Sequence, residues 1–226
     1  MNYQELSARI QAYAENDFPA SAGNLSSPQQ IATFVQQAEE RIYNTAQIPA
    51  LRRNVTGNTT ATNKYLACPD DFLSVYSMAA VTPGGDYEYL LNKDVNFIRA
   101  AYPNAGSTGI PKYYALFGPR SSNDTELAFI LGPTPDAAYT IELHYFYYPE
   151  SIVTAGTSWL GDNYDPVLLY GALREAYIYM RGEADMIANI EARYQEALGQ
   201  LKRLGDGLER NDAYRAGQTS LQYNKL

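Results

Sequence analysis

The chain has 226 residues, of which 46% are hydrophobic and 19% are charged, and its formal net charge is −8. These proportions are typical of a folded protein and exclude a wholly disordered chain. The acidic balance disfavours tight binding to a nucleic-acid backbone, which depends on clustered lysine and arginine side chains. The length suits one large domain or two closely joined domains.

The spacing of apolar residues predicts two helices in the first 48 residues. Leu6, Ile10 and Tyr13 follow a helical spacing, which indicates an amphipathic helix over residues 3–14. After a polar loop, Ser27-Pro28 begins a second helix. Its apolar stripe consists of Ile31, Phe34, Val35, Ala38 and Ile42.

Residues 49–153 change to short aromatic and β-branched runs separated by Gly, Pro and Asn, which is typical of β-structure. We expect a hairpin from residues 71–81 and 87–91, with a turn at Pro83-Gly84-Gly85-Asp86. A short helix is predicted within residues 93–102. Three further strands are predicted at residues 113–117, 126–131 and 139–147, the last with one buried face.

Helix is predicted again in the last third of the chain. Asp165 is expected to cap a helix that has Pro166 at its first position and ends near Met180. A second helix is predicted over residues 183–204, ended by Gly205-Asp206-Gly207. Residues 208–226 are polar with isolated Tyr and Leu side chains, and are expected to form an extended arm.

These elements predict an α+β fold. Residues 1–48 and 154–207 are expected to form one helical bundle, because neither helix pair can bury its apolar stripe alone. Residues 49–153 are expected to form an inserted antiparallel β-rich domain, and residues 208–226 a C-terminal arm. The 21 tyrosines suit both strands and protein interfaces.

Residues with catalytic potential are few. Cys68 is the only cysteine and His144 the only histidine, so no intrachain disulfide, cysteine-based zinc site or multi-histidine metal site can form. We expect Cys68 to be a buried thiol and His144 a packed or hydrogen-bonded strand residue. Asp70-Asp71 is expected to cap or solvate the start of a strand. With no phosphate loop or dinucleotide fingerprint, the sequence predicts no enzyme, no cofactor and no metal.

No secretory signal and no membrane-spanning apolar run are recognisable, so we expect no membrane association.

Five strings stand out along the chain. They are Phe34-Val35-Gln36-Gln37-Ala38-Glu39-Glu40-Arg41-Ile42, Leu66 to Ser74, Gly109-Ile110-Pro111-Lys112-Tyr113-Tyr114, Ile141-Glu142-Leu143-His144-Tyr145, and Leu168-Leu169-Tyr170-Gly171-Ala172-Leu173 with Glu175-Ala176. Together, in this order, they resemble the head-to-tail adaptor (tail tubular or neck) proteins of short-tailed bacteriophages. The similarity extends over about residues 3–217.

The resemblance implies a structural virion protein made in the host cytoplasm. It implies a ring, expected to have twelve copies, that joins the capsid portal protein to a tail nozzle or tail tube, while the free chain can be a monomer. DNA would pass through the ring channel without sequence-specific binding. The resemblance also implies portal binding by the C-terminal arm, for which the candidate residues are Tyr214, Arg215, Leu221, Tyr223 and Leu226.

Two other functions remain open on the sequence. Exposed aromatic side chains could stack on sugars in a receptor- or carbohydrate-binding tail module. Acidic residues at 70–71 and 124–142 could supply the carboxylate pair of a hydrolase acting on cell-wall or capsular sugar, although nothing in the sequence places two of them in one cleft.

Overall fold

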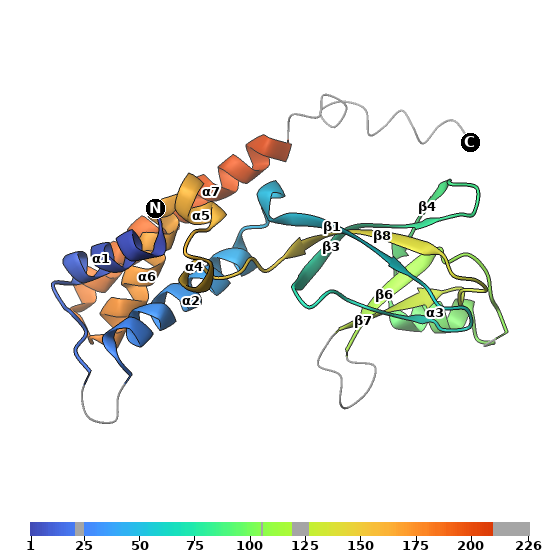
Figure 1. The fold of residues 1–226 in the computed structure, drawn as a ribbon, viewed down its shortest axis with the longest axis horizontal. Coiled ribbons are helices and arrows are strands. Elements are labelled where there is room, and N and C mark those ends of the chain that lie inside the picture. Colours follow the sequence, from blue (N-terminus) through green and yellow to red (C-terminus); the bar gives the residue numbers. More distant parts are fainter. Residues whose placement is uncertain (21–24, 105, 119–126, 210–226) are drawn as a thin grey trace. The chain divides into compact units, whose positions relative to one another are not determined.

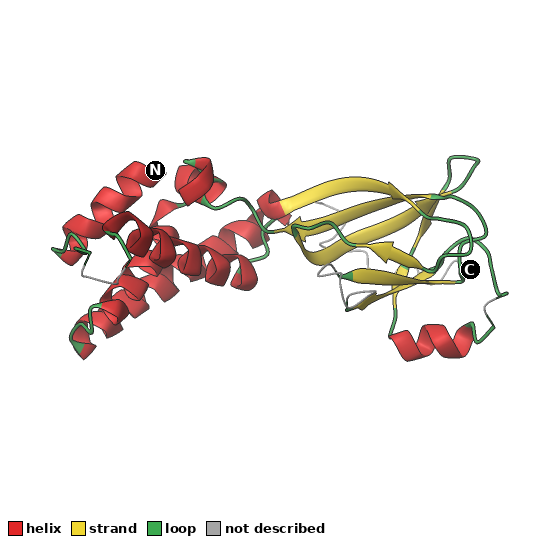
Figure 2. Ribbon diagram, turned by 60° about the horizontal axis from the view of Figure 1, so that its bottom comes forward, coloured by secondary structure: helices red, strands yellow, loops and turns green. Residues whose placement is uncertain are grey.

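The computed structural model describes residues 1–20, 25–104, 106–118 and 127–209. It divides the chain into two compact units, one formed by residues 1–51 with residues from 149 onward, the other by residues 52–148. Helices make up the first unit, and strands with one short helix make up the second (Figures 1 and 2). The predicted α+β class is therefore confirmed.

The helical unit contains α1 (Tyr3–Ala14), α2 (Ser27–Thr45), the 3-10 turn η1 (Pro49–Leu51), α4 (Ile152–Ala155), α5 (Trp159–Asn163), α6 (Asp165–Tyr179) and α7 (Ala184–Glu209). Helix α6 is central, because it packs against α1, α2, α5 and α7. Its side chains Leu168, Ala172 and Ala176 are fully buried. Helices that are distant in sequence thus share one apolar core.

The helix starts follow local capping chemistry. The Asn2 side chain accepts a hydrogen bond from the Glu5 backbone N–H, and the Glu5 carboxylate accepts one from the Asn2 backbone N–H, which together form a capping box at the start of α1. Ser26 and Gln29 form the corresponding box at α2. Both N-terminal helices were therefore predicted correctly, including the start of α2 at Ser27, with Ser26 as its N-cap.

Two predictions about the C-terminal helices are wrong. Asp165 is the first residue of α6 and Tyr164 is its N-cap, because the end of α5 leads directly into α6. The Asp165 carboxylate, in the first turn, instead interacts favourably with the positive end of the helix dipole. Helix α7 does not end at Gly205-Asp206-Gly207 but continues to Glu209. Gly205 is buried against Ile48, where a larger residue would collide. Packing therefore explains this glycine better than helix termination does.

The β unit contains two four-stranded sheets. Sheet A has the order β1-β8-β3-β4 and is antiparallel throughout. Its strands are β1 (Arg52–Asn58), β8 (Thr140–Tyr147), β3 (Phe72–Val81) and β4 (Tyr87–Tyr89). Sheet B has the order β2-β7-β6-β5 and joins β2 (Tyr65–Ala67), β7 (Ala128–Gly132), β6 (Tyr113–Phe117) and β5 (Leu91–Asn92).

The core of the β unit lies between the two sheets, and helix α3 (Val95–Ala101) covers the other face of sheet B. Ile141, Leu143 and Tyr145 of β8 pack with Tyr114, Phe129 and Leu131 of sheet B. Ile98 of α3 packs with Ala115 and Ile130. The predicted buried face of the last strand is confirmed. The predicted return strand 87–91 is instead two strands, because the chain leaves sheet A after Tyr89 and joins sheet B at Leu91.

Candidate interaction surfaces

Cys68 and His144, two of the residues considered for catalysis, both lie in the β unit. Cys68 is buried, as predicted. His144 lies on β8 with its Nε2 3.7 Å from Glu142 Oε1, and its side chain is nearly half exposed. In the described residues, no three His, Cys, Asp or Glu side chains cluster as a metal site would require, and no helix is both long and apolar enough to cross a membrane.

Asp71 has a structural role rather than a solvated one. One carboxylate oxygen accepts a hydrogen bond from Tyr145 Oη at 2.7 Å, and the other pairs with Arg53 Nη1 at 2.6 Å. Burial, followed by the hydrogen bond to Asp71, raises the pKa of Tyr145 to about 12. The start of β3 is thereby fixed to β8 and β1. The prediction that Asp70-Asp71 caps or solvates a strand start is therefore wrong for Asp71, which has two side-chain partners, while Asp70 is exposed.

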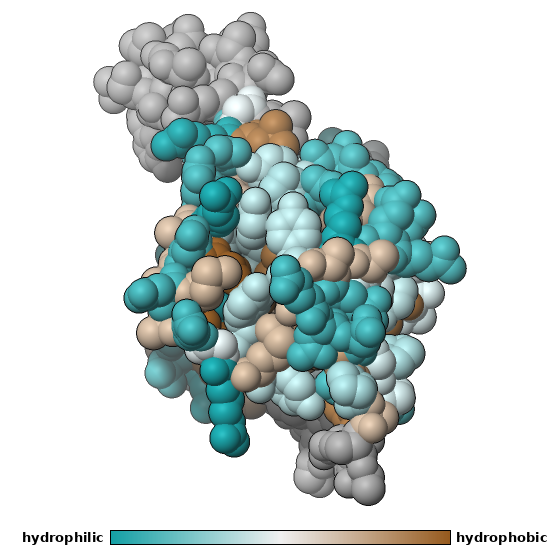
Figure 3. Space-filling model, turned by 90° about the vertical axis from the view of Figure 1, so that its left-hand side faces the viewer, coloured by the Kyte–Doolittle hydropathy of each residue, from teal (hydrophilic) through white to brown (hydrophobic). Residues whose placement is uncertain are grey.

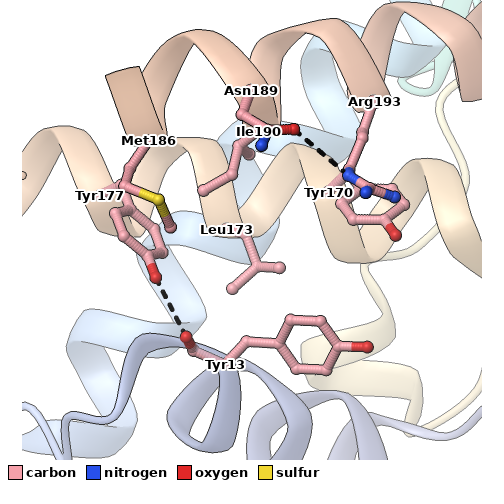
Figure 4. Close-up of a pocket in the computed structure, with 8 residues that line it drawn as sticks. All are labelled: Tyr13, Tyr170, Leu173, Tyr177, Met186, Asn189, Ile190 and Arg193. Atoms are coloured by element: carbon pink, nitrogen blue, oxygen red, sulfur yellow. Dashed lines mark hydrogen bonds between the residues drawn. The ribbon is translucent and has the colours of Figure 1, made fainter. Parts of the chain in front are cut away.

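An open pocket of about 340 Å³ lies between α1, α6 and α7 in the helical unit (Figure 4). Leu173 and Ile190 give it a buried apolar floor, while Tyr13 and Met186 at its rim are about half exposed. Tyr177 Oη donates a hydrogen bond to the Tyr13 carbonyl at 3.0 Å, which fixes the end of α1 to α6. We call this site the helical-unit pocket.

The charge at this pocket comes from one side chain among those that line it. Arg193 Nε donates a hydrogen bond to Asn189 Oδ1, the oxygen of a neutral amide, at 3.3 Å (Figure 4). An apolar floor beside a guanidinium suits a partner that presents an apolar side chain near a carboxylate. The visible face of the helical unit otherwise mixes hydrophilic side chains with small groups of apolar ones (Figure 3).

The second candidate surface is the face of sheet A that points away from sheet B, which we call the outer face. The Arg52 guanidinium lies 3.9 Å from the Tyr76 ring centroid and 4.9 Å from that of Phe146. Tyr87 and Tyr89 stack with ring centroids 6.5 Å apart, and both are more than half exposed. Exposed tyrosine with arginine is the composition of protein interfaces.

Between these groups, polar side chains link the strands of the outer face. Asn54 Nδ2 donates to Glu142 Oε1 at 2.9 Å. The charge of Glu142, and a hydrogen bond to it, raise the pKa of the Tyr87 hydroxyl. The outer face is therefore an ordered polar and aromatic surface.

The candidate arm residues Tyr214, Arg215, Leu221, Tyr223 and Leu226 lie outside the described residues. The helical-unit pocket was missed from the sequence, because Tyr13 was placed on the apolar face of the first helix, whereas its side chain is half exposed at the pocket. The pocket also depends on where α1 ends relative to α6 and α7, for which no local sequence signal exists.

A comparison with protein families matches residues 1–220 to the family described as SU10 adaptor protein. The chain belongs to the SU10 adaptor protein family. The suspected membership of the phage adaptors is thus confirmed, and the adaptor is a structural component of a bacteriophage virion that contacts other virion components. No curated protein matches the adaptor significantly.

Within each unit, residues from different strings of the resemblance contact one another. Arg41, from the first string, pairs with Glu175, beside the last, at 2.7 Å between Nη2 and Oε1. Tyr145 and Asp71 come from two further strings and share the hydrogen bond described above. These motif residues therefore make contacts that hold each unit together.

Proposed function

We propose that the chain is one subunit of an adaptor ring that joins the capsid portal protein to the tail nozzle or tail tube, with DNA passing through the ring. The observation that carries this proposal is the family match over residues 1–220. The net charge of −8 supports it, because an acidic wall repels phosphate groups and lets DNA slide past. Twelve copies are expected from the resemblance to short-tailed phage adaptors.

The arm beyond α7 is the proposed contact with the portal protein. Tyr214, Arg215, Leu221, Tyr223 and Leu226 would supply its anchors, since spaced apolar side chains in a polar segment can order on a partner's groove. The helical-unit pocket is proposed as a further contact, because its apolar floor and Arg193 suit an apolar side chain beside a carboxylate. The β unit would receive the tail component.

Electron microscopy of the full chain mixed with its cognate portal protein tests the proposal. We expect a ring of adaptor subunits on the portal. The chain ending at Glu209 keeps the whole of α7 and removes only the proposed arm, so it should bind the portal at least tenfold more weakly, which corresponds to about 1.4 kcal/mol.

Two outcomes would contradict the proposal at different levels. Undiminished portal binding by the shortened chain would refute the arm while leaving the adaptor role intact. Absence of any complex between the full chain and the portal protein would refute direct portal contact. A Tyr214→Ser, Tyr223→Ser variant of the full length separates loss of the anchors from loss of chain length, since it should bind as weakly as the shortened chain.

A further inference from the structure

Strand β1 forms one free edge of sheet A, and the hydrogen-bond pattern shows which of its backbone groups point outward. The Thr59 N–H donates to the Tyr139 carbonyl at 2.9 Å, in register with the β1–β8 pairs. Because antiparallel pairs alternate, every second residue before Thr59 bonds to β8, and Asn54 and Thr56 direct their N–H and C=O groups away from it. No strand among the described residues pairs with that side of β1.

Strand β4 forms the opposite edge of sheet A, and the same reasoning applies. The Leu90 N–H donates to the Met78 carbonyl, and the Thr82 N–H donates to the Asp86 carbonyl, both at 2.9 Å. Alternation then directs the backbone groups of Glu88 toward β3. The backbone groups of Tyr87 and Tyr89 point to the free edge, which no other described strand occupies.

The two edges carry opposite charge. Strand β1 contains Arg52 and Arg53 and no acidic residue, whereas residues 83–89 contain Asp86 and Glu88 and no basic residue. Arg53 is partly neutralised by Asp71, but its side chain is more than half exposed. Neither Asp86 nor Glu88 belongs to an ion pair in the described part of the chain, and both are exposed. Charge therefore favours contact between unlike edges and opposes contact between like edges.

Strand direction is compatible with the same contact. Each neighbouring pair in the order β1-β8-β3-β4 is antiparallel, so β1 and β4 run in opposite directions. A second copy placed with its β1 beside β4 of the first would continue the antiparallel pattern. Side chains of Asn54 and Thr56 from one copy would then share the outer face with Tyr87 and Tyr89 of the next.

We propose that edge β1 of one copy pairs with edge β4 of the next, so that sheet A continues from subunit to subunit. The contact joins two different surfaces and is therefore heterologous, which is the kind of interface that closes a ring. This proposal rests on the proposed function and extends it, because a contact between copies of the chain presupposes the ring of identical subunits. Matching the strand centres pairs Val55 with Glu88, and Thr56 with Tyr87.

Cross-linking of single-cysteine substitutions tests this contact. Thr56→Cys and Tyr87→Cys variants keep all four charged residues of the two edges, and the native Cys68 is buried. With a short bismaleimide, a mixture of the two full-length variants should give a covalent dimer containing one chain of each. Either variant alone should give no more covalent dimer than the unmodified chain does. A chain carrying both cysteines should give a ladder of higher covalent oligomers.

The charge contribution is tested separately with Glu88→Lys in the Tyr87→Cys chain. Reversing this charge should lower the yield of mixed dimer about fivefold, the factor expected for losing one exposed ion pair. Asp206→Lys makes the same change of net charge on α7 and should leave the yield unchanged. Equal loss with both variants would overturn the charge-matched contact in favour of a general charge effect.

The cross-linking is carried out on the free chain and on the chain bound to its portal protein. Rings on the portal without mixed cross-links would refute the edge contact and leave the proposed function standing. Mixed cross-links in the free chain without portal binding would support the contact and refute the portal role. Cross-linking of Thr56→Cys to itself as readily as to Tyr87→Cys would overturn the heterologous arrangement.

Discussion

At the scale of single residues, a few buried polar groups determine how the elements meet. The Glu39 side chain of α2 is buried and accepts a hydrogen bond from the Ile152 N–H at 2.9 Å, at the start of α4. Burial raises the pKa of the Glu39 carboxyl, although hydrogen bonds from Ile152 and Ser151 oppose the shift. Burying the Glu39 carboxyl costs desolvation free energy, but its hydrogen bond to Ile152 fixes the path of the chain after the β unit.

Glu39→Gln is predicted to change the pH dependence of stability. Because the folded-state pKa of Glu39 is raised, the folded chain holds this proton more strongly than the unfolded chain does. The contribution of Glu39 to folding therefore weakens as pH rises above the ordinary glutamate range. Urea unfolding at pH 5 and pH 7 should show a smaller loss of stability for Glu39→Gln than for the unchanged protein over this interval.

The neighbouring exposed residue Glu40 provides the control, since Glu40→Gln removes the same charge from the same helix at an exposed position. It should leave the pH dependence as it is. Glu39→Ala should instead lower the unfolding free energy by about 1–3 kcal/mol, because the Ile152 N–H loses its acceptor. An identical pH profile for Glu39→Gln and the unchanged protein would refute the assignment.

A second residue-scale prediction concerns the Tyr145–Asp71 hydrogen bond. Tyr145→Phe keeps the packed ring and removes the hydroxyl, so it should lower the unfolding free energy by about 1.5 kcal/mol, near the low end for a bond to a charged group. The pKa of Tyr145 is raised to about 12, so its contribution should be lost as pH rises from 10 through 12. Tyr13→Phe, at an exposed side chain, should change neither quantity; equal effects of both substitutions would contradict the prediction.

At the scale of elements, sequence patterns predicted those structures whose signals are local. The helices α1 and α2 have capping boxes and apolar stripes, and β8 alternates fully buried with less buried positions from Thr140 to Tyr145. Strand β1 was missed because six of its seven residues are exposed, so no alternation exists to read. The passage of the chain from β4 to β5 was missed because it depends on contacts with another sheet, and not on residues 87–92 themselves.

Helix α7 shows how one residue type can mislead, and its glycines give a matched pair of substitutions. Gly205→Ala places a Cβ 2.5 Å from Ile48 Cγ2 and should destabilise the protein by about 1–3 kcal/mol, as overpacking does. Gly199→Ala meets no atom within 4 Å and should stabilise it by about 0.8 kcal/mol, through helix propensity. Thermal unfolding of both variants measures the difference. Stabilisation by Gly205→Ala would show that α7 does not pack closely on Ile48 at this position.

At the scale of the whole molecule, the chain enters and leaves sheet A at neighbouring strands, which allows the β unit to be inserted into the helical unit. Arg52 and Phe146 are paired across β1 and β8, so the two connections to the helical unit leave the sheet from neighbouring strands. The apolar clusters of the β unit consist wholly of residues from within 52–148. An inserted unit with its own core and adjacent ends meets the requirements for independent folding.

We therefore predict that residues 52–148 fold when produced alone. The isolated fragment should show a cooperative thermal transition with near-ultraviolet circular dichroism from its packed tyrosines. Leu143→Ala removes a side chain from the core between the sheets and should lower the unfolding free energy by about 2–5 kcal/mol, while Leu116→Ala, at an exposed side chain, should cost far less. A fragment without a cooperative transition, or one equally sensitive to both substitutions, would mean that the β unit depends on the helical unit for its structure. Substitutions in the helical unit could then also disturb the edges of sheet A. Their effects on assembly would have to be tested in the intact chain.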